Sequence, residues 1–153
     1  MHFSGVLWRT SCFRGPSALT LDSKGRIAVP VRHRDVLTRM AAATVTVTKN
    51  PPGGLLIFPP AVWADFSARV AALPMESSGW KRLFLGNAVE VEIDASSRLL
   101  VAPELRTFAD LSRDVMLLGM GNYLELWDKR RYDEHESQVV SSPMPESIKN
   151  FIL

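Results

Sequence analysis

The chain has 153 residues, of which 46% are hydrophobic and 22% are charged, with a formal net charge of +2. These values are those of an ordinary folded domain and exclude a disordered chain. No apolar run approaches the roughly 20 residues that a membrane-spanning helix needs. A single cysteine and three scattered histidines give neither an internal disulfide nor a metal site. Because the first twelve residues also lack the pattern of a secretory signal, we expect a cytosolic protein without a cofactor.

The first half of the chain predicts a strand, a turn, a second strand, a helix, a hairpin and a second helix. The turn over 22–26 is predicted by Asp22, which can bond back to the local backbone, and by Gly25, which permits a positive φ. Pro30 ends the second strand and precedes an apolar spacing typical of a helix. The expected ranges are strands at 17–21 and 27–30, a helix at 31–40, strands at 44–48 and 55–58, and a helix from 59 to 73.

The second half predicts the same order of elements after a boundary at 74–79, which is followed by a short helix over 80–85. A strictly alternating strand precedes its turn, and the tail carries apolar residues spaced for a short amphipathic turn that docks on a neighbour. The expected ranges are a strand at 89–93, a helix at 103–111, strands at 115–118 and 123–127 around a turn at 119–122, a helix at 128–140 and a tail at 143–153.

One motif, an Asp and an Arg four residues apart, occurs once in each half. Asp22 and Arg26 return as Asp94 and Arg98, so both members move by the same offset (94−22 = 98−26 = 72). A single pair at this spacing is common on helix surfaces, but two copies in matching surroundings indicate a tandem duplication. Because such short strands bury little surface alone, we predict an α+β fold in which both copies close a small pseudo-twofold β-barrel with flanking helices.

The two halves differ in charge. Residues 1–76 hold nine Lys and Arg against four Asp and Glu, whereas residues 77–153 hold nine against twelve, which gives +5 and −3. A basic half favours an anionic partner, of which nucleic acid is the commonest. The same imbalance also suits solubility or the pairing of unlike faces between subunits, so charge alone leaves both interpretations open.

Several separated motifs resemble the MraZ family of bacterial transcriptional regulators, which is built from two AbrB-like swapped-hairpin halves. The motifs lie at 13–15, 21–30, 82–88, 117–119 and 125–127, and they agree with the family in order and spacing. The resemblance implies a nucleoid-associated homo-oligomer, ring-shaped, that binds G-rich direct repeats in the promoter of the division and cell-wall gene cluster. It divides the chain into a first half at 13–76, which binds DNA, a structural and oligomerising second half at 77–142, and the tail at 143–153.

The chain departs from the family pattern in two places. Twelve residues precede Phe13, and they are either a real extension, which we expect to be disordered, or the product of an upstream start assigned in error. The second loop reads Ala-Ser-Ser over 95–97, where the first loop has Ser-Lys-Gly over 23–25. We therefore assign the DNA contact to the first loop.

The candidate DNA-contacting residues are Arg14, Lys24, Arg26, Arg32 and Arg34. An Arg can pair with two acceptors on guanine in the major groove, and a Lys can reach phosphate or the same guanine edge. Phosphates would repel Asp22, so we expect Asp22 and Gly25 to structure the first loop, as Asp94 and Arg98 structure the second. Because an Arg held fully by Asp22 cannot contact a base, Arg26 is expected to be shared or released towards DNA, while Arg98 stays paired.

Two other classes of function compete with DNA binding. An oligomeric scaffold or antitoxin-like module of the same fold would hold a protein partner, with the tail as its contact. Independently of the class of function, the alternative for both Asp/Arg pairs is that they only fix their hairpins, and a solvated helix face is as good an assignment for Arg32 and Arg34 as phosphate contact. An enzyme is disfavoured, because the sequence offers no nucleophile with a nearby base and no glycine loop for phosphate. The expected partners are double-stranded DNA and further copies of the chain, without a membrane or a small-molecule substrate.

Overall fold

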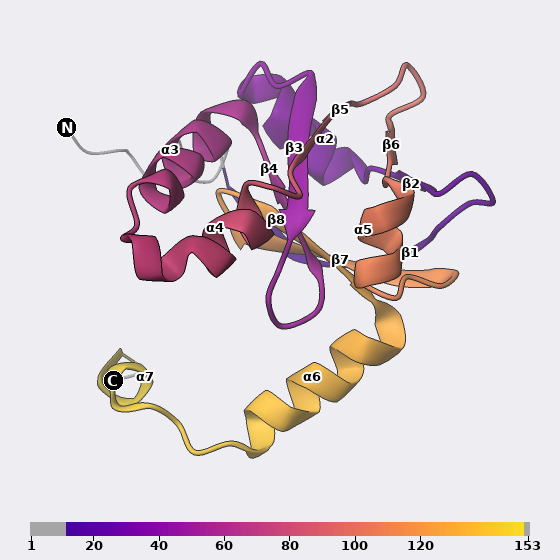
Figure 1. Cartoon of the computed structure of the whole chain (residues 1–153). Coiled ribbons are helices and arrows are strands. Elements are labelled where there is room, and N and C mark those ends of the chain that lie inside the picture. The colour runs from indigo at the N-terminus through magenta and orange to yellow at the C-terminus, as the bar shows by residue number, and fades with distance from the viewer. Residues whose placement is uncertain (1–11, 152–153) are drawn as a thin grey trace.

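The computed structural model describes residues 12–151, in which two sheets are flanked by helices (Figure 1). The expected extension over 1–12 therefore lies outside the described residues, except for Cys12. The elements of the first half are β1 (Phe13–Thr20), β2 (Arg26–Ala28), α2 (Val31–Arg39), β3 (Thr44–Lys49), β4 (Leu55–Phe58) and α3 (Pro60–Ala71). A short 3-10 helix (Met75–Ser77) and α4 (Ser78–Phe84) follow. The later elements are β5 (Val89–Glu92), β6 (Arg98–Leu100), α5 (Pro103–Phe108), β7 (Asp114–Gly121), β8 (Leu124–Asp128), α6 (Lys129–Ser141) and α7 (Glu146–Phe151).

The strands of the two halves pair with each other. The larger sheet has the order β1-β7-β8-β4-β3-β5, and its neighbours are antiparallel. The smaller sheet is an antiparallel ribbon of β2 and β6. Strands β1 to β4 of the first half correspond, in order, to β5 to β8 of the second half. When each strand is replaced by its counterpart, the order of the larger sheet reverses and the ribbon is unchanged. The two halves are therefore related by a pseudo-twofold arrangement, and neither half has a sheet of its own.

The larger sheet does not close into the barrel that the sequence predicts. Its edges are β1 and β5, and within residues 12–151 no ladder of hydrogen bonds joins them. The turns after these edge strands lead the chain out of the larger sheet and into the ribbon. Ile27 and Leu99 pair at the centre of the ribbon and are 1% and 3% exposed. The ribbon is thus held on the core by apolar burial, which needs no backbone ladder to the larger sheet.

The pairing of β1 with β7 is longer than the sequence predicts. It extends over eight residue pairs, from Phe13 opposite Gly121 to Thr20 opposite Asp114, and so includes Gly119, which the sequence places in a turn. A Cβ atom at Gly119 would lie 2.1 Å from the backbone nitrogen of Arg14. This glycine therefore permits a close approach of two strands, a use of glycine that is common inside strands.

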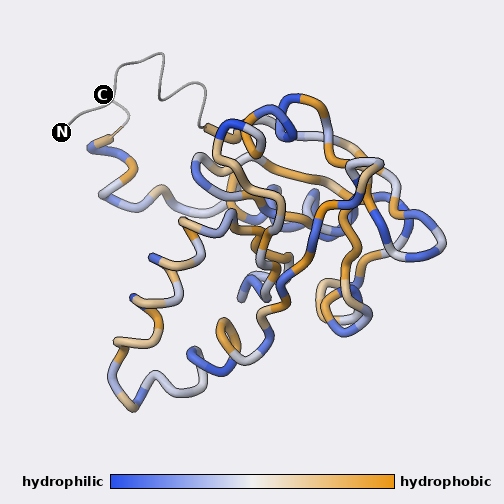
Figure 2. The backbone as a smooth tube through the Cα atoms, turned by 90° about the horizontal axis from the view of Figure 1, so that it is seen from above, coloured by the Kyte–Doolittle hydropathy of each residue, from blue (hydrophilic) through white to orange (hydrophobic). Residues whose placement is uncertain are grey.

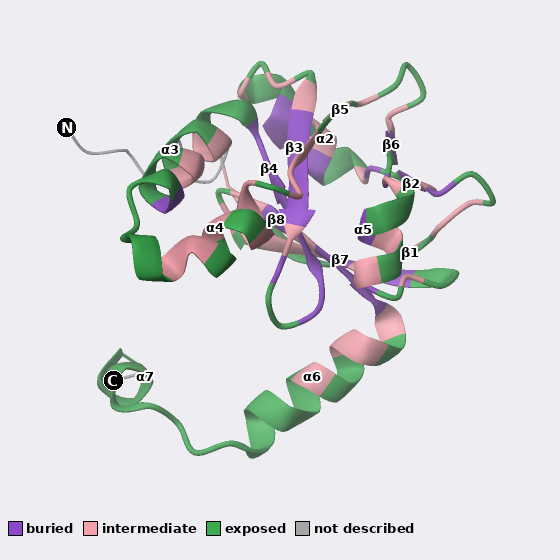
Figure 3. Ribbon diagram, viewed as in Figure 1, coloured by how far each residue is buried: buried purple, intermediate pink, exposed green. Residues whose placement is uncertain are grey.

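One hydrophobic core lies between the sheets and helices and receives side chains from both halves. Its largest fully buried apolar members are Phe13, Ile27, Leu55, Ile57, Leu105, Leu117, Leu126, Val45, Val47, Val101 and Val115. The buried and apolar segments gather at the centre of the molecule, whereas α7 and much of α6 are exposed (Figures 2 and 3). No described helix is both long and apolar enough to cross a bilayer.

Candidate nucleic-acid interface

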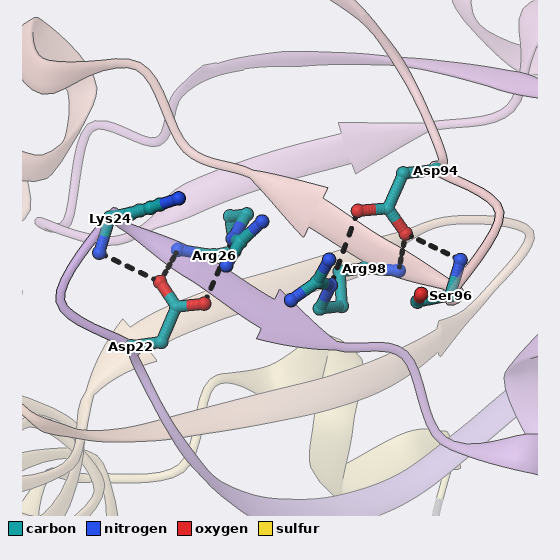
Figure 4. Close-up of polar contacts among 6 residues, drawn as sticks. All are labelled: Asp22, Lys24, Arg26, Asp94, Ser96 and Arg98. Carbon is teal, nitrogen blue, oxygen red and sulfur yellow. Dashed lines mark hydrogen bonds and ion pairs between the residues drawn. The ribbon is translucent and has the colours of Figure 1, made fainter.

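Asp22 organises the turn between β1 and β2, which we call the first loop (residues 22–26). One carboxylate oxygen, Oδ1, accepts the backbone N–H groups of Lys24 and Arg26, each at 2.9 Å. The other oxygen, Oδ2, accepts Nε of Arg26 at 2.9 Å. These donors, chiefly the backbone N–H of Arg26, hold the pKa of Asp22 below its usual value. The carboxylate is therefore charged at neutral pH and fixes the loop from within, while Lys24 stays exposed (Figure 4).

The second loop (residues 94–98) has the same construction. Oδ1 of Asp94 accepts the backbone N–H groups of Ser96 and Arg98, each at 2.9 Å, and Oδ2 accepts Nε of Arg98 at 3.2 Å. The backbone N–H of Arg98 is the main cause that lowers the pKa of Asp94. The two loops lie at opposite ends of the β2–β6 ribbon (Figure 4). The repeated sequence motif is therefore a repeated structural motif.

Arg26 and Arg98 are both paired with the aspartate of their own loop, so the sharing or release of Arg26 towards DNA stays a prediction. The ion pair is shorter in the first loop, 2.9 Å against 3.2 Å, and the side chain of Arg26 is less exposed, 24% against 37%. Only Nε contacts the carboxylate. Within residues 12–151, the two terminal nitrogens of Arg26 have no hydrogen-bond partner. Pairing therefore orients the guanidinium and leaves its outer edge open, which removes the conflict between pairing and base contact.

The outward face of the ribbon brings the two arginines together. Ile27 and Leu99 point into the core at the middle of the ribbon, so the residues on either side of them face outward. The outward residues are Arg26 opposite Leu100 and Ala28 opposite Arg98. This face is a short two-stranded surface with a guanidinium near each end, beside Leu100 at one end and Ala28 at the other.

Arg14 and Arg32 lie apart from the first loop. Arg14 is near the start of β1, and six residues of extended strand, roughly 20 Å, separate it from the end of that strand. Arg32 on α2 lines the same pocket as Arg14. Its Nη2 donates to the carbonyl oxygen of Pro16 and to the hydroxyl of Ser17, both at 2.7 Å. Arg14 and Arg32 therefore form a second basic site along β1, separate from the loop.

Arg34 lies under the second loop, where its Nη1 contacts Oγ of Ser97 at 3.4 Å. Its counterpart Arg106, on α5, lies under the first loop: a Cβ atom at Gly25 would come within 2.7 Å of Cζ of Arg106. Arg106 is absent from the residues predicted from the sequence. It stands 72 positions after Arg34 (106−34), the same offset as the Asp/Arg motif. Applying this offset to Arg34 would therefore have identified Arg106 from the sequence.

The fold and the site define a class of protein: two interleaved repeats that present matched Asp-organised loops with arginines on a small ribbon. In residues 12–151 no group of His, Cys, Asp or Glu side chains could hold a metal ion. A family model described as "MraZ protein, putative antitoxin-like" matches residues 12–79 and again 84–150. The chain belongs to the MraZ family.

Curated relatives from several bacteria are similar over almost their whole length. A protein of Methylibium petroleiphilum is 59% identical over 139 residues, which cover 91% of this chain and 95% of the relative. Proteins of Leptothrix cholodnii and Verminephrobacter eiseniae are 54% and 52% identical over the same share of this chain, and over 95% and 98% of their own lengths. All three bear the name transcriptional regulator MraZ, so the relatives are named as regulators and not as enzymes.

Proposed function

We propose that the chain is a transcriptional regulator that binds double-stranded DNA through its first loop. The observation that carries the proposal is the geometry of this loop, in which Asp22 fixes the backbone, Lys24 is exposed and Arg26 keeps its outer edge open. The loop is at the end of a two-stranded ribbon, and the major groove of DNA admits an element of that size. The names of the relatives support the same function.

Within this proposal, Arg26 contacts guanine and Lys24 contacts phosphate or the same guanine edge. Arg is suited to the two acceptors that guanine presents in the major groove, and its orientation by Asp22 reduces the entropy lost on binding. The second loop has no Lys, because Ser96 stands at that position. We therefore propose that the first half, 13–76, contacts DNA, whereas the second half, 77–142, supports the fold and the assembly.

A single loop makes too few contacts for tight and specific binding, so we propose that several copies act together as a ring. Joining copies raises affinity when the spacing of DNA repeats fits the spacing of the loops. A ring needs two different faces on each copy. The end of α6 and the tail carry exposed apolar residues that no described part of the chain covers: Val139 (58%), Val140 (79%), Met144 (47%), Ile148 (42%) and Phe151 (84%).

We propose that this C-terminal arm, residues 139–151, contacts the next copy. In Figure 1 the arm extends away from the sheets, whereas the first half of α6 is packed: at the middle of this helix, His135 stacks on Trp127 with ring centroids 4.9 Å apart. A different apolar surface lies between the halves, where Met75 is 86% and Trp80 54% exposed. These two unlike surfaces suit a head-to-tail contact. From the resemblance to the family, we propose that the target repeats lie in the promoter of the division and cell-wall gene cluster, and that the protein acts in the cytoplasm at the nucleoid.

A gel-shift titration with the DNA upstream of the chain's own gene tests the proposal. The double variant Lys24→Ala and Arg26→Ala is expected to abolish the shifted band while sizing chromatography shows the same assembly as the wild type. Arg98→Ala is the matched control, because it removes the equivalent arginine from the second loop. A wild-type protein that gives no shift would refute DNA binding, and an equal loss in Arg98→Ala would refute the division between the halves.

The exposed arm also favours a second candidate function, an antitoxin-like or scaffolding module that holds a protein partner. The description of the matching family model contains the term antitoxin-like. In this case, removal of residues 142–153 would release a co-purifying partner, and the double loop variant would bind that partner as well as the wild type does. The gel-shift titration and partner capture thus separate the two candidates.

A further inference from the structure

The first loop is supported by an arginine from the opposite half of the chain. A Cβ atom built on Gly25 would lie 2.7, 2.8 and 2.9 Å from Cζ, Nε and Nη1 of Arg106. These three distances are nearly equal, so the guanidinium presents its flat face to the α-carbon of Gly25. Arg106 is itself fixed, because its Nε donates to the carbonyl oxygen of Val101 at 3.0 Å. The N–H of Val101 in turn donates to the carbonyl oxygen of Gly25 at 2.9 Å.

The second loop has the mirrored arrangement in a weaker form. The N–H of Val29 donates to the carbonyl oxygen of Ser97 at 2.9 Å, as Val101 does to Gly25. Among residues 12–151, the guanidinium of Arg34 donates only to the hydroxyl of Ser97, at 3.4 Å, and its buried Nε has no hydrogen-bond partner. A serine side chain thus occupies the place that the guanidinium face fills beneath the first loop.

Position 25 is where the two loops differ in what lies against the backbone. Gly25 has a φ of +84°, which favours glycine, but Ser97 adopts a φ of +60° in the same kind of turn. The turn alone therefore tolerates a side chain. A Cβ atom at Gly25 would, however, require the guanidinium of Arg106 to move away from the loop.

We propose that Arg106 is a positioning residue for DNA binding: it holds the first loop in its binding shape from the opposite half. Gly25 lies between Lys24 and Arg26, so a flat group against its α-carbon limits the movement of both cationic side chains. The second half then takes part in DNA recognition through α5, although its own loop has no Lys. Arg34, by the same geometry, supports the second loop. This inference rests on the proposed function, because it concerns the shape in which the first loop meets DNA.

The test compares Arg106→Ala and Arg106→Lys with the matched control Arg34→Ala in the full chain. Affinity for the upstream DNA is measured by fluorescence anisotropy, with sizing chromatography as the check on assembly. Arg106→Ala is expected to weaken binding by roughly tenfold, the effect of one charged hydrogen-bonding group, and Arg34→Ala by much less. Arg106→Lys is expected to restore little, because an ammonium has no planar face.

A second readout needs no DNA. Hydrogen exchange of the amides of residues 24–26 in the free protein is expected to become faster in Arg106→Ala and to stay unchanged in Arg34→Ala. Gly25→Ser introduces the residue that the second loop has at this position. It is expected to weaken DNA binding by itself, and adding Arg106→Ala to it is expected to change the affinity very little further. Such non-additivity is the signature of two residues in contact.

The outcomes separate this inference from the proposed function. If the wild type binds DNA and Arg106→Ala binds equally well, or if Arg34→Ala loses as much affinity, the inference is overturned and the proposed function stands. If the wild type does not bind DNA, the proposed function falls, and unchanged amide exchange in Arg106→Ala then overturns the inference as well. If Arg106→Ala fails to fold, Arg106→Lys and Gly25→Ser decide the question by the same two readouts.

Discussion

The stability of the protein is expected to fall in mild acid because of one buried histidine. His33 lies on α2 with only 1% of its surface exposed, and its ring packs against Phe13 with centroids 5.7 Å apart. Its Nε2 is buried without a hydrogen-bond partner among residues 12–151. Burial, and then the nearby charge of Arg32, lowers the pKa of His33 from 6.5 to about 4.

The sign and size of the effect follow from this difference in pKa. Above pH 6.5 the ring is neutral in both the folded and the unfolded chain, so its contribution to stability is complete. Between pH 6.5 and about 4 the unfolded chain binds a proton that the folded chain refuses, and the free energy of unfolding falls. Each pH unit in this window removes up to about 1.4 kcal/mol, so the total loss is about 2 to 3 kcal/mol.

The assay is urea unfolding of the wild type and of His33→Leu at several pH values between 7.5 and 4.5. The wild type is expected to lose stability relative to His33→Leu as the pH falls, because the variant has no ring to protonate. Because both proteins contain the same Asp and Glu residues, the effect of protonating these carboxylates cancels in the difference between the two free energies of unfolding. Parallel stability curves for the two proteins across this window would refute the reasoning, whatever their absolute difference.

Two further changes are expected to act through packing and capping. Asp128 is 4% exposed and caps α6, accepting the hydroxyl of Ser112 at 2.7 Å and the N–H of Arg131 at 3.2 Å. Asp128→Ala should therefore lower the free energy of unfolding in urea by about 1 to 3 kcal/mol, and an unchanged midpoint would contradict this. Gly119→Ala should destabilise the β1–β7 pair, because a Cβ atom there would meet the backbone of Arg14, whereas Gly79→Ala meets nothing within 4 Å and should leave the melting temperature unchanged or higher.

The order of the elements could be predicted from the sequence, because it depends on local signals. Prolines, turn residues and apolar periodicity predict the end of α2 to within one residue of its observed end. They also predict α4, β5 and β8 to within a few residues of their observed bounds. The two loops could also be predicted, since the repeated Asp/Arg motif is short and its hydrogen bonds are internal to each loop. Local chemistry of this kind is contained in the residues themselves.

The partners of the strands could not be predicted in the same way. The alternation of apolar and polar residues predicts which face of a strand is buried, but not which strand lies beside it. Periodicity therefore did not predict the separate ribbon or the open edges of the larger sheet. The destinations of Arg34 and Arg106 depend on that pairing, because each lies under the loop of the other half. Sites built between halves therefore required the three-dimensional structure.

Exchanging the sequence of the first loop for that of the second tests whether the first loop is the element that binds DNA. Ser23→Ala, Lys24→Ser and Gly25→Ser together give the first loop the sequence of the second, while Asp22 and Arg26 are retained. We predict that this protein keeps its assembly and loses its affinity for the upstream DNA. Unchanged affinity in the exchanged protein would contradict the claim that the first loop is the DNA-binding element.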